Sequence, residues 1–284
     1  MKTAYSPPLS GEAEGRSGAG GEILEFLFQV LLIFFWKRRK KMKDFKGKTN
    51  SEDKLIRATQ RAIGALDNGW VGAQTMSDLA VAVGAEGCWP CTMRIYDMPV
   101  IIAKDIVVAN PGSGCKNFAN SLSGSFSYQQ KPCSIMVNQG KEVWGAACHA
   151  WLDKPESVLY RMENGTFGIM RAKYSTELPD GIRWAVGAMG LLENYDPAAE
   201  GFSGAYADVL RKTNHTVLGV KAGMVHLVYC RNMTGQQVNE FCRDKLKLEM
   251  AVMLDGGNVA AINGAESFAK INTSQAQYYL IQAV

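Results

Sequence analysis

The sequence predicts an α+β fold, in which a mixed or antiparallel sheet domain with packed helices follows a small all-helical module. Residues 49–90 contain two helical patterns of apolar residues around a glycine-rich turn. From residue 95 to residue 284, short β-type runs alternate with Gly, Asn and Pro, as strands and turns do. One amphipathic helix pattern, at residues 234–247, lies between such runs. We therefore expect three parts, at 1–48, 49–90 and 95–284.

The composition is that of a folded chain with one strongly basic segment. Hydrophobic residues make up 47% of the sequence and charged residues 20%, which is enough to bury a core. Residues 37–48 hold eight basic residues and one acidic residue, a local charge of +7. Because the whole chain carries +4, the remainder carries about 4 − 7 = −3. A mildly acidic body argues against nucleic acid as a partner, because nucleic-acid binding depends on neutralising phosphates.

The first 48 residues leave two interpretations open. Residues 1–22 are rich in Gly, Ser, Pro and Glu, and we expect them to be disordered. The apolar run at 23–36 has 14 residues, fewer than the roughly 20 of a spanning helix. Its basic cluster follows it, whereas a signal peptide carries its charge in front. Residues 23–48 are therefore either an interfacial or membrane anchor with a basic flank, or sequence upstream of a natural start at Met42.

The module at 49–90 has clear helix and turn signals. Ser51 can cap a helix, and Asn68-Gly69 is a turn signal in the segment "LDNGWVG". This segment resembles the peptidoglycan-binding type 1 module over about 30 residues. The matching residues are Gln60, Ala62, Ile63, Gly64, Asp67, Gly69, Gly72 and Thr75, with one inserted Asn. The resemblance implies a cell-wall glycan as partner and makes Asp67, Gly69, Trp70 and Thr75 the wall-binding candidates. A helical hairpin without a ligand is the alternative.

Hairpin patterns dominate the region after residue 95. The segment "SVLYRMENGTFGIMRA" turns at Asn164-Gly165, a favoured two-residue hairpin turn. A second hairpin runs over 215–231, with its turn at 221–223. Thr234 and Gln237 then fit a capping box that begins the amphipathic helix. That helix leads into an apolar strand at 250–254, which ends on Asp255 and two glycines.

The order of these elements resembles the phosphodiester glycosidase domain family, of the N-acetylglucosamine-1-phosphodiester α-N-acetylglucosaminidase type. The counterparts here are residues 123–126, the hairpin at 132–141, "HTVLGV" at 215–220, the helix at 234–246 and "AVMLDGG" at 251–257. Together they cover about 170 residues. The chain departs from the family pattern at Ser123-Gly124 in place of Asn-Gly, at His215 in place of Arg, and at Asn258-Val259 in place of Gly-Ser.

The resemblance implies hydrolysis of a glycosyl phosphodiester. A carboxylate stabilises the oxocarbenium-like transition state at the anomeric carbon, and Asp255 suits this role. His215 would bind phosphate when protonated, or act as a base when neutral. The substrate-binding candidates are Gly256, Gly257, Asn258, Thr216, Arg211 and Ser125. An acidic hairpin turn at Asp255 is the alternative.

The sequence thus predicts a bacterial or phage enzyme directed at the cell wall, in the wall or outside the cell. A non-catalytic glycan-binding or structural protein with the same fold is the alternative, as is a membrane-associated location. No P-loop, HExxH or GxSxG motif occurs, which argues against a nucleotide, zinc-protease or serine-hydrolase site. The single CxxC pair, Cys88 and Cys91, has no partner pair, so we expect no metal site and no cofactor.

Overall fold

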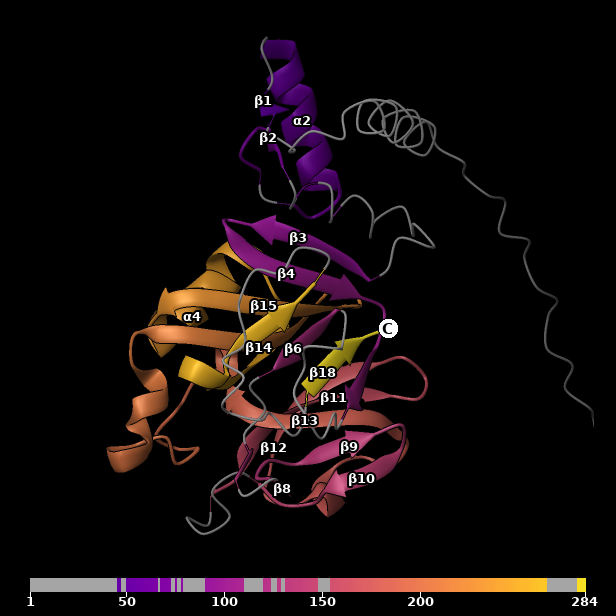
Figure 1. Cartoon of the computed structure of the whole chain (residues 1–284). Coiled ribbons are helices and arrows are strands. Elements are labelled where there is room, and N and C mark those ends of the chain that lie inside the picture. Colours follow the sequence, from indigo (N-terminus) through magenta and orange to yellow (C-terminus); the bar gives the residue numbers. More distant parts are fainter. Residues whose placement is uncertain are drawn as a thin grey trace, which may run out of the picture. The chain divides into compact units, whose positions relative to one another are not determined.

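A computed structural model describes residues 45–46, 50–65, 67–72, 75, 78, 90–109, 120–123, 127–128, 131–147, 154–264 and 280–284 (Figure 1). All of these residues belong to the unit Asp44–Val284. The predicted disordered segment and the apolar run at 23–36 lie outside the described residues. Within the described part of the chain, no helix has the length and apolar character needed to cross a membrane.

The N-terminal module combines a helix with a small β ladder. Helix α2 (Asn50–Ala62) lies between strand β1 (Phe45–Lys46) and strand β2 (Trp70–Val71) in the sequence. The two strands pair antiparallel, with Phe45 opposite Val71. The prediction of an all-helical module is therefore wrong. The chain after the turn is extended because it pairs with residues that precede the helix, a contact that the helical periodicity does not reveal.

The rest of the structure is built mainly from antiparallel strands. In the large sheet the strand order is β10-β9-β13-β16-β14-β15-β4-β3, and β11 pairs with both β12 and β13. Its strands are β3 (Cys91–Ile95), β4 (Met98–Ala103), β9 (Met136–Asn138), β10 (Lys141–Trp144), β11 (Glu156–Met162), β12 (Phe167–Ala172), β13 (Ile182–Gly190), β14 (Thr213–Lys221), β15 (Met224–Met233) and β16 (Met250–Gly256). Figure 1 shows β4, β15 and β14 side by side.

Smaller sheets accompany the large one. In the second sheet the order is β17-β6-β18-β5. Its strands are β5 (Ile106–Ala109), β6 (Ser121–Ser123), β17 (Ala261–Asn263) and β18 (Leu280–Ala283). Strands β7 (Ser127–Tyr128) and β8 (Lys131–Pro132) form a separate pair.

The predicted α+β class is wrong, because the described chain is mostly β. The α-helices with described bounds are α2 and α4 (Gly235–Glu240), and a π-helix, η6 (Phe241–Leu246), continues α4. The capping box at Thr234 and Gln237 is confirmed. Strands that are distant in sequence join into one antiparallel sheet, and they account for more of the described chain than the helices do.

The core surrounds the central strands β14 and β16. On β16 the four residues 251–254 are fully buried, and on β14 so are Val217 and Leu218. Helix α4 and η6 add Val238, Cys242 and Leu246 to the same cluster, as the predicted apolar stripe requires. Strand β16 pairs with β13 on one side and β14 on the other, and its side chains are buried in the core. The strand that carries Asp255 near its end is therefore held firmly.

Candidate functional site

The site is formed where β14 begins and β16 ends. We call it the diglycine site and define it as Arg211, Thr213, His215, Thr216, Asp255, Gly256 and Gly257. His215 is paired with Gly256 in the ladder between the two strands. The structure therefore brings together two segments that lie some forty residues apart in the sequence.

The ladder between β14 and β16 is irregular at Asp255. His215 is opposite Gly256, but Val217, two residues further on, is opposite Met253, three residues back. Strand β16 therefore carries one extra residue between Met253 and Gly256, next to Asp255. A β-bulge of this kind bends the strand and changes the direction of its side chains.

The other neighbour of β14 has an extra residue at the same level. Thr213 is opposite Met233, whereas His215 is opposite Cys230, so two steps on β14 match three on β15. Asn232, within the extra segment, has a φ of 54°, in the left-handed region. His215 thus lies between two bulged strands, and the start of β14 departs from regular alternation.

Asp255 is held by the residues around it. The amide of Gly256 donates to Asp255 Oδ1 over 2.7 Å, and Thr216 Oγ1 donates to the carbonyl of Asp255 over 3.2 Å. Asp255 is half-buried, and Thr216 is fully buried. The first contact holds the carboxylate and the second holds the backbone of Asp255 near the end of the strand.

Both glycines after Asp255 are required by their surroundings. A Cβ on Gly256 would lie 2.7 Å from Asn214 O and 2.8 Å from His215 Nδ1. Gly257 has a φ of 66°, and its Cβ would lie 3.2 Å from Arg211 Nη2. Neither position accepts a side chain without displacement or strain.

The His215 ring is buried and neutral. Its Nε2 lies 2.9 Å from Met233 O and 3.2 Å from Arg211 O, whereas its buried Nδ1 has no hydrogen-bond partner. Because carbonyl oxygens only accept, this network assigns the proton to Nε2. Burial lowers the pKa of His215, and the positive charge of Arg211 lowers it further. This environment argues against the predicted role as a protonated phosphate ligand.

The remaining candidates differ in how they lie. Arg211 is exposed at the start of β14. Asn258 lies in the short 3-10 turn η7 (Gly257–Val259). Ser125 lies outside the described residues. Thr213, between Arg211 and His215, was not predicted as a site residue. Simple alternation along β14 does not predict which side chains lie near the glycines, because the two neighbouring strands are bulged.

The loop after β13 contains an acidic side chain, Glu200, that is held by backbone amides. Glu200 is buried, and it accepts from Ser157 N at 2.9 Å and from Gly190 N at 3.1 Å. Its Oε1 also lies 3.5 Å from Arg171 Nη2. Burial raises the pKa of the Glu200 carboxyl, although these hydrogen bonds and the charge of Arg171 act to lower it. Glu200 thus anchors its loop to β11 and β13.

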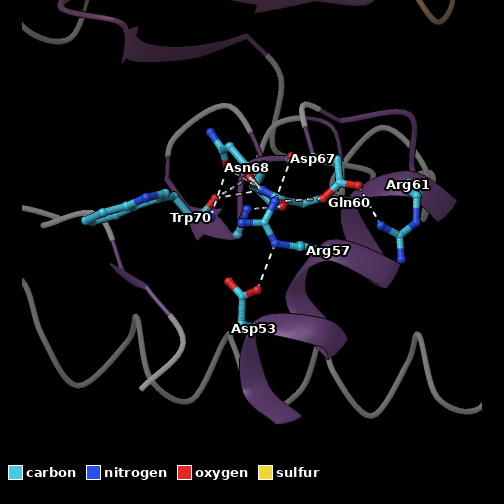
Figure 2. A network of polar contacts seen from close by, with 9 residues as sticks. Asp53, Arg57, Gln60, Arg61, Asp67, Asn68 and Trp70 are labelled. Carbon is cyan, nitrogen blue, oxygen red and sulfur yellow. Dashed lines mark hydrogen bonds and ion pairs between the residues drawn. The ribbon is translucent and has the colours of Figure 1, made fainter. Parts of the chain in front are cut away.

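A polar network stabilises the turn of the N-terminal module (Figure 2). Asp67 accepts from Arg57 at 3.3 Å and from Arg61 at 2.5 Å, and Arg57 also binds Asp53 at 2.8 Å. Gly69 has a φ of 72°, in the left-handed region, so the turn favours glycine there. Asp67 and Gly69, both wall-binding candidates, therefore have partners or close neighbours inside the module.

Gln60 is at the centre of this network. It is fully buried, its Nε2 lies 2.7 Å from Trp70 O and 3.1 Å from Thr75 Oγ1, and its Oε1 accepts from Gly69 N at 3.0 Å. Asn68 Oδ1 accepts from Trp70 N at 2.9 Å. The backbone of Trp70 is thus fixed on both sides. Its ring points away from the network (Figure 2), and the residue as a whole is 44% exposed.

Comparisons with solved structures reveal a distant likeness of fold. No protein-family model and no curated protein sequence matches the chain. Among solved structures, it is similar to the catalytic domain of zebrafish N-acetylglucosamine-1-phosphodiester α-N-acetylglucosaminidase, auto-inhibited by its pro-peptide. The TM-score is 0.50 at 16% identity, over 66% of this chain and 76% of that one. The fold is distantly phosphodiester glycosidase-like. The predicted resemblance is confirmed at the level of the fold, and the peptidoglycan-binding resemblance stays a prediction.

A second structure is more distant. A hypothetical protein from Synechocystis matches with a TM-score of 0.41 and 11% identity, over 65% of this chain and 59% of that one.

Proposed function

We propose that the chain is a hydrolase that cleaves glycosyl phosphodiesters of the N-acetylglucosamine type, with Asp255 as its catalytic carboxylate. The observation that supports this most is the position of Asp255. It ends a buried central strand of a glycosidase-like fold, next to a glycine pair and to the start of β14. An acidic turn in solvent would lack the fixed carbonyl, the bulge and the neighbouring buried histidine.

The chemistry requires little more than one placed carboxylate and donors for phosphate oxygens. The bond between the anomeric carbon and the phosphate oxygen breaks and a phosphate monoester leaves. Water then supplies a hydroxyl to the anomeric carbon and releases one proton to the solvent. Positive charge develops on the sugar ring, and a carboxylate beside it stabilises that charge. The departing monoester has a second pKa near 6, about ten units below that of water, so it needs less help from a general acid than a sugar hydroxyl does.

The test is release of free sugar. The full chain is incubated with an N-acetylglucosamine-1-phosphodiester, and N-acetylglucosamine is measured over time. We expect turnover by the wild type and a loss of about a hundredfold or more in Asp255→Asn. Asp244→Asn is the matched control, because Asp244 is an exposed aspartate bound to Arg243 outside the site. Absence of product, or equal rates in Asp255→Asn and the wild type, would refute the enzymatic proposal.

Glycan binding without turnover is the second candidate, and Trp70 favours it. An exposed indole on a fixed backbone offers a flat apolar face of the kind that packs against a sugar ring. We propose a bacterial or phage cell-wall glycan as the ligand, as the module's resemblance implies. This would place the protein at the cell wall or outside the cell.

Sedimentation with purified cell walls separates the two candidates. We expect wall binding by the wild type and weaker binding by Trp70→Ala. Tyr174→Ala is the control, since Tyr174 is also an exposed aromatic residue, at 46%, but lies outside the module. Wall binding that needs Trp70, together with no sugar release, would support a binding protein. Equal sedimentation of Trp70→Ala and the wild type would exclude Trp70 as the contact.

A further inference from the structure

Two side chains, from Arg211 just before β14 and from Thr213 at its first position, lie close to Gly257. The Cβ that Gly257 lacks would lie 3.2 Å from Arg211 Nη2 and 3.9 Å from Thr213 Oγ1. A guanidinium and a hydroxyl therefore border the same small space above the glycine. In the sequence, the proposed catalytic carboxylate, Asp255, is two residues before Gly257.

His215, which lies next to Gly256, holds the backbone of Arg211 in place. His215 Nε2 lies 3.2 Å from the carbonyl of Arg211 and 2.9 Å from that of Met233. The first contact spans four residues along the chain, and the second reaches across to β15. Arg211 is exposed, so ordering it when an anion binds costs conformational entropy. That cost is smaller when the backbone of Arg211 is already held in place. The buried ring holds that backbone in place.

We infer that Arg211 and Thr213 form an anion subsite for the phosphate of the substrate, and that His215 is its positioning residue. A planar guanidinium binds two phosphate oxygens at once, and a hydroxyl adds a third donor. A phosphodiester carries one negative charge, which one arginine balances. Without that arginine, the charge of Asp255 would repel the substrate. The inference rests on the proposed function for the identity of the sugar, but the anion subsite is measurable by itself.

Binding of inorganic phosphate to the full chain, measured by calorimetry, tests the subsite directly. We expect the wild type to bind phosphate and Arg211→Gln to bind it at least about tenfold more weakly, the loss typical of a charged hydrogen bond. Thr213→Val should weaken binding by a few fold. Lys212→Gln is the matched control, because Lys212 is an exposed cation at the next position. It should bind as the wild type does.

The subsite and the proposed enzyme fail in different ways. Asp255→Asn should keep or increase phosphate affinity while losing sugar release. Phosphate binding that depends on Arg211, without any sugar release, would refute the proposed function and leave the subsite. A wild type that binds no phosphate, an Arg211→Gln variant equal to the wild type, or a Lys212→Gln variant that loses binding would overturn the subsite.

The role of His215 is tested by a pair of substitutions. Glutamine places an N–H close to where His215 Nε2 lies, whereas phenylalanine keeps the ring and has no donor. We expect His215→Gln to retain phosphate affinity and His215→Phe to lose it by several fold. With the phosphodiester, His215→Phe should raise KM by a larger factor than it lowers kcat. Thermal unfolding of both variants shows that they are folded. Equal phosphate affinity and equal KM in the two variants would refute the positioning role.

Discussion

His226 gives the sharpest test of the buried sheet. It lies within β15, is 4% exposed, and its Nδ1 is 3.2 Å from Met224 O. Burial lowers the pKa of His226 from 6.5 to about 4, and the positive charge of Lys221 contributes. The perturbation is acid, and the matched variant is His226→Gln, which can still donate to a carbonyl but does not titrate.

The sign follows from which state binds the proton first. In the unfolded chain the pKa of His226 is near 6.5, so as the pH falls the unfolded state is protonated while the folded state is not. The contribution to the free energy of unfolding is complete above pH 6.5 and is lost as the pH falls towards 4. Each unit of pKa difference corresponds to about 1.4 kcal/mol, so the full loss is about 3 kcal/mol. Burial lowers the pKa of His215 too, so it acts in the same direction.

Urea denaturation near neutral pH and near the lower pKa measures this loss. Carboxylates titrate in both proteins, so the difference between wild type and His226→Gln isolates His226. We expect the wild type to lose about 2 kcal/mol more than the variant between about pH 7 and pH 4.5. If the variant loses as much stability as the wild type, His226 is not buried in the neutral form and the description of β15 is wrong.

Three further predictions concern the site loop, the anchored carboxylate and the module. In thermal unfolding, Gly256→Ala should cost about 1–3 kcal/mol, because its Cβ would meet a carbonyl and a buried ring. Gly145→Ala is the control and should cost less, since its Cβ would meet a flexible glutamate side chain. Equal costs would contradict this. Glu200→Ala should cost about 2–4 kcal/mol in urea, since it leaves buried amides unpaired, and exposed Glu193→Ala should stay within about 0.5 kcal/mol. Gln60→Leu should make the module sensitive to proteolysis, and resistance equal to the wild type would show that its network is dispensable.

Local signals in the sequence were dependable. Asn164-Gly165 predicted the turn between β11 and β12, and Gly165 has the required positive φ of 90°. Thr234 and Gln237 predicted the capping box that begins α4. These features depend on neighbours within four residues, so the chain itself specifies them.

Non-local pairing caused the errors in the fold. The module was predicted to be all-helical, with Trp70 and Val71 in a turn, but these two residues pair with a strand that precedes the helix. The α+β class was predicted because the large sheet was not visible in the sequence. Strand β4 pairs with β15, and β13 pairs with β16, each across more than sixty residues. Periodicity in one segment does not reveal which distant segment will pair with it.

By itself the sequence determined that an apolar strand leads to Asp255 and two glycines, and that a second strand begins near His215. The tertiary structure decided how these meet. One extra residue on each neighbour of β14 changes the strand register, and this change places Arg211 and Thr213 over Gly257. Burial then decided that His215 is neutral and supports the site from below. Register and desolvation arise only when strands pack, which is why neither is visible in the residues alone.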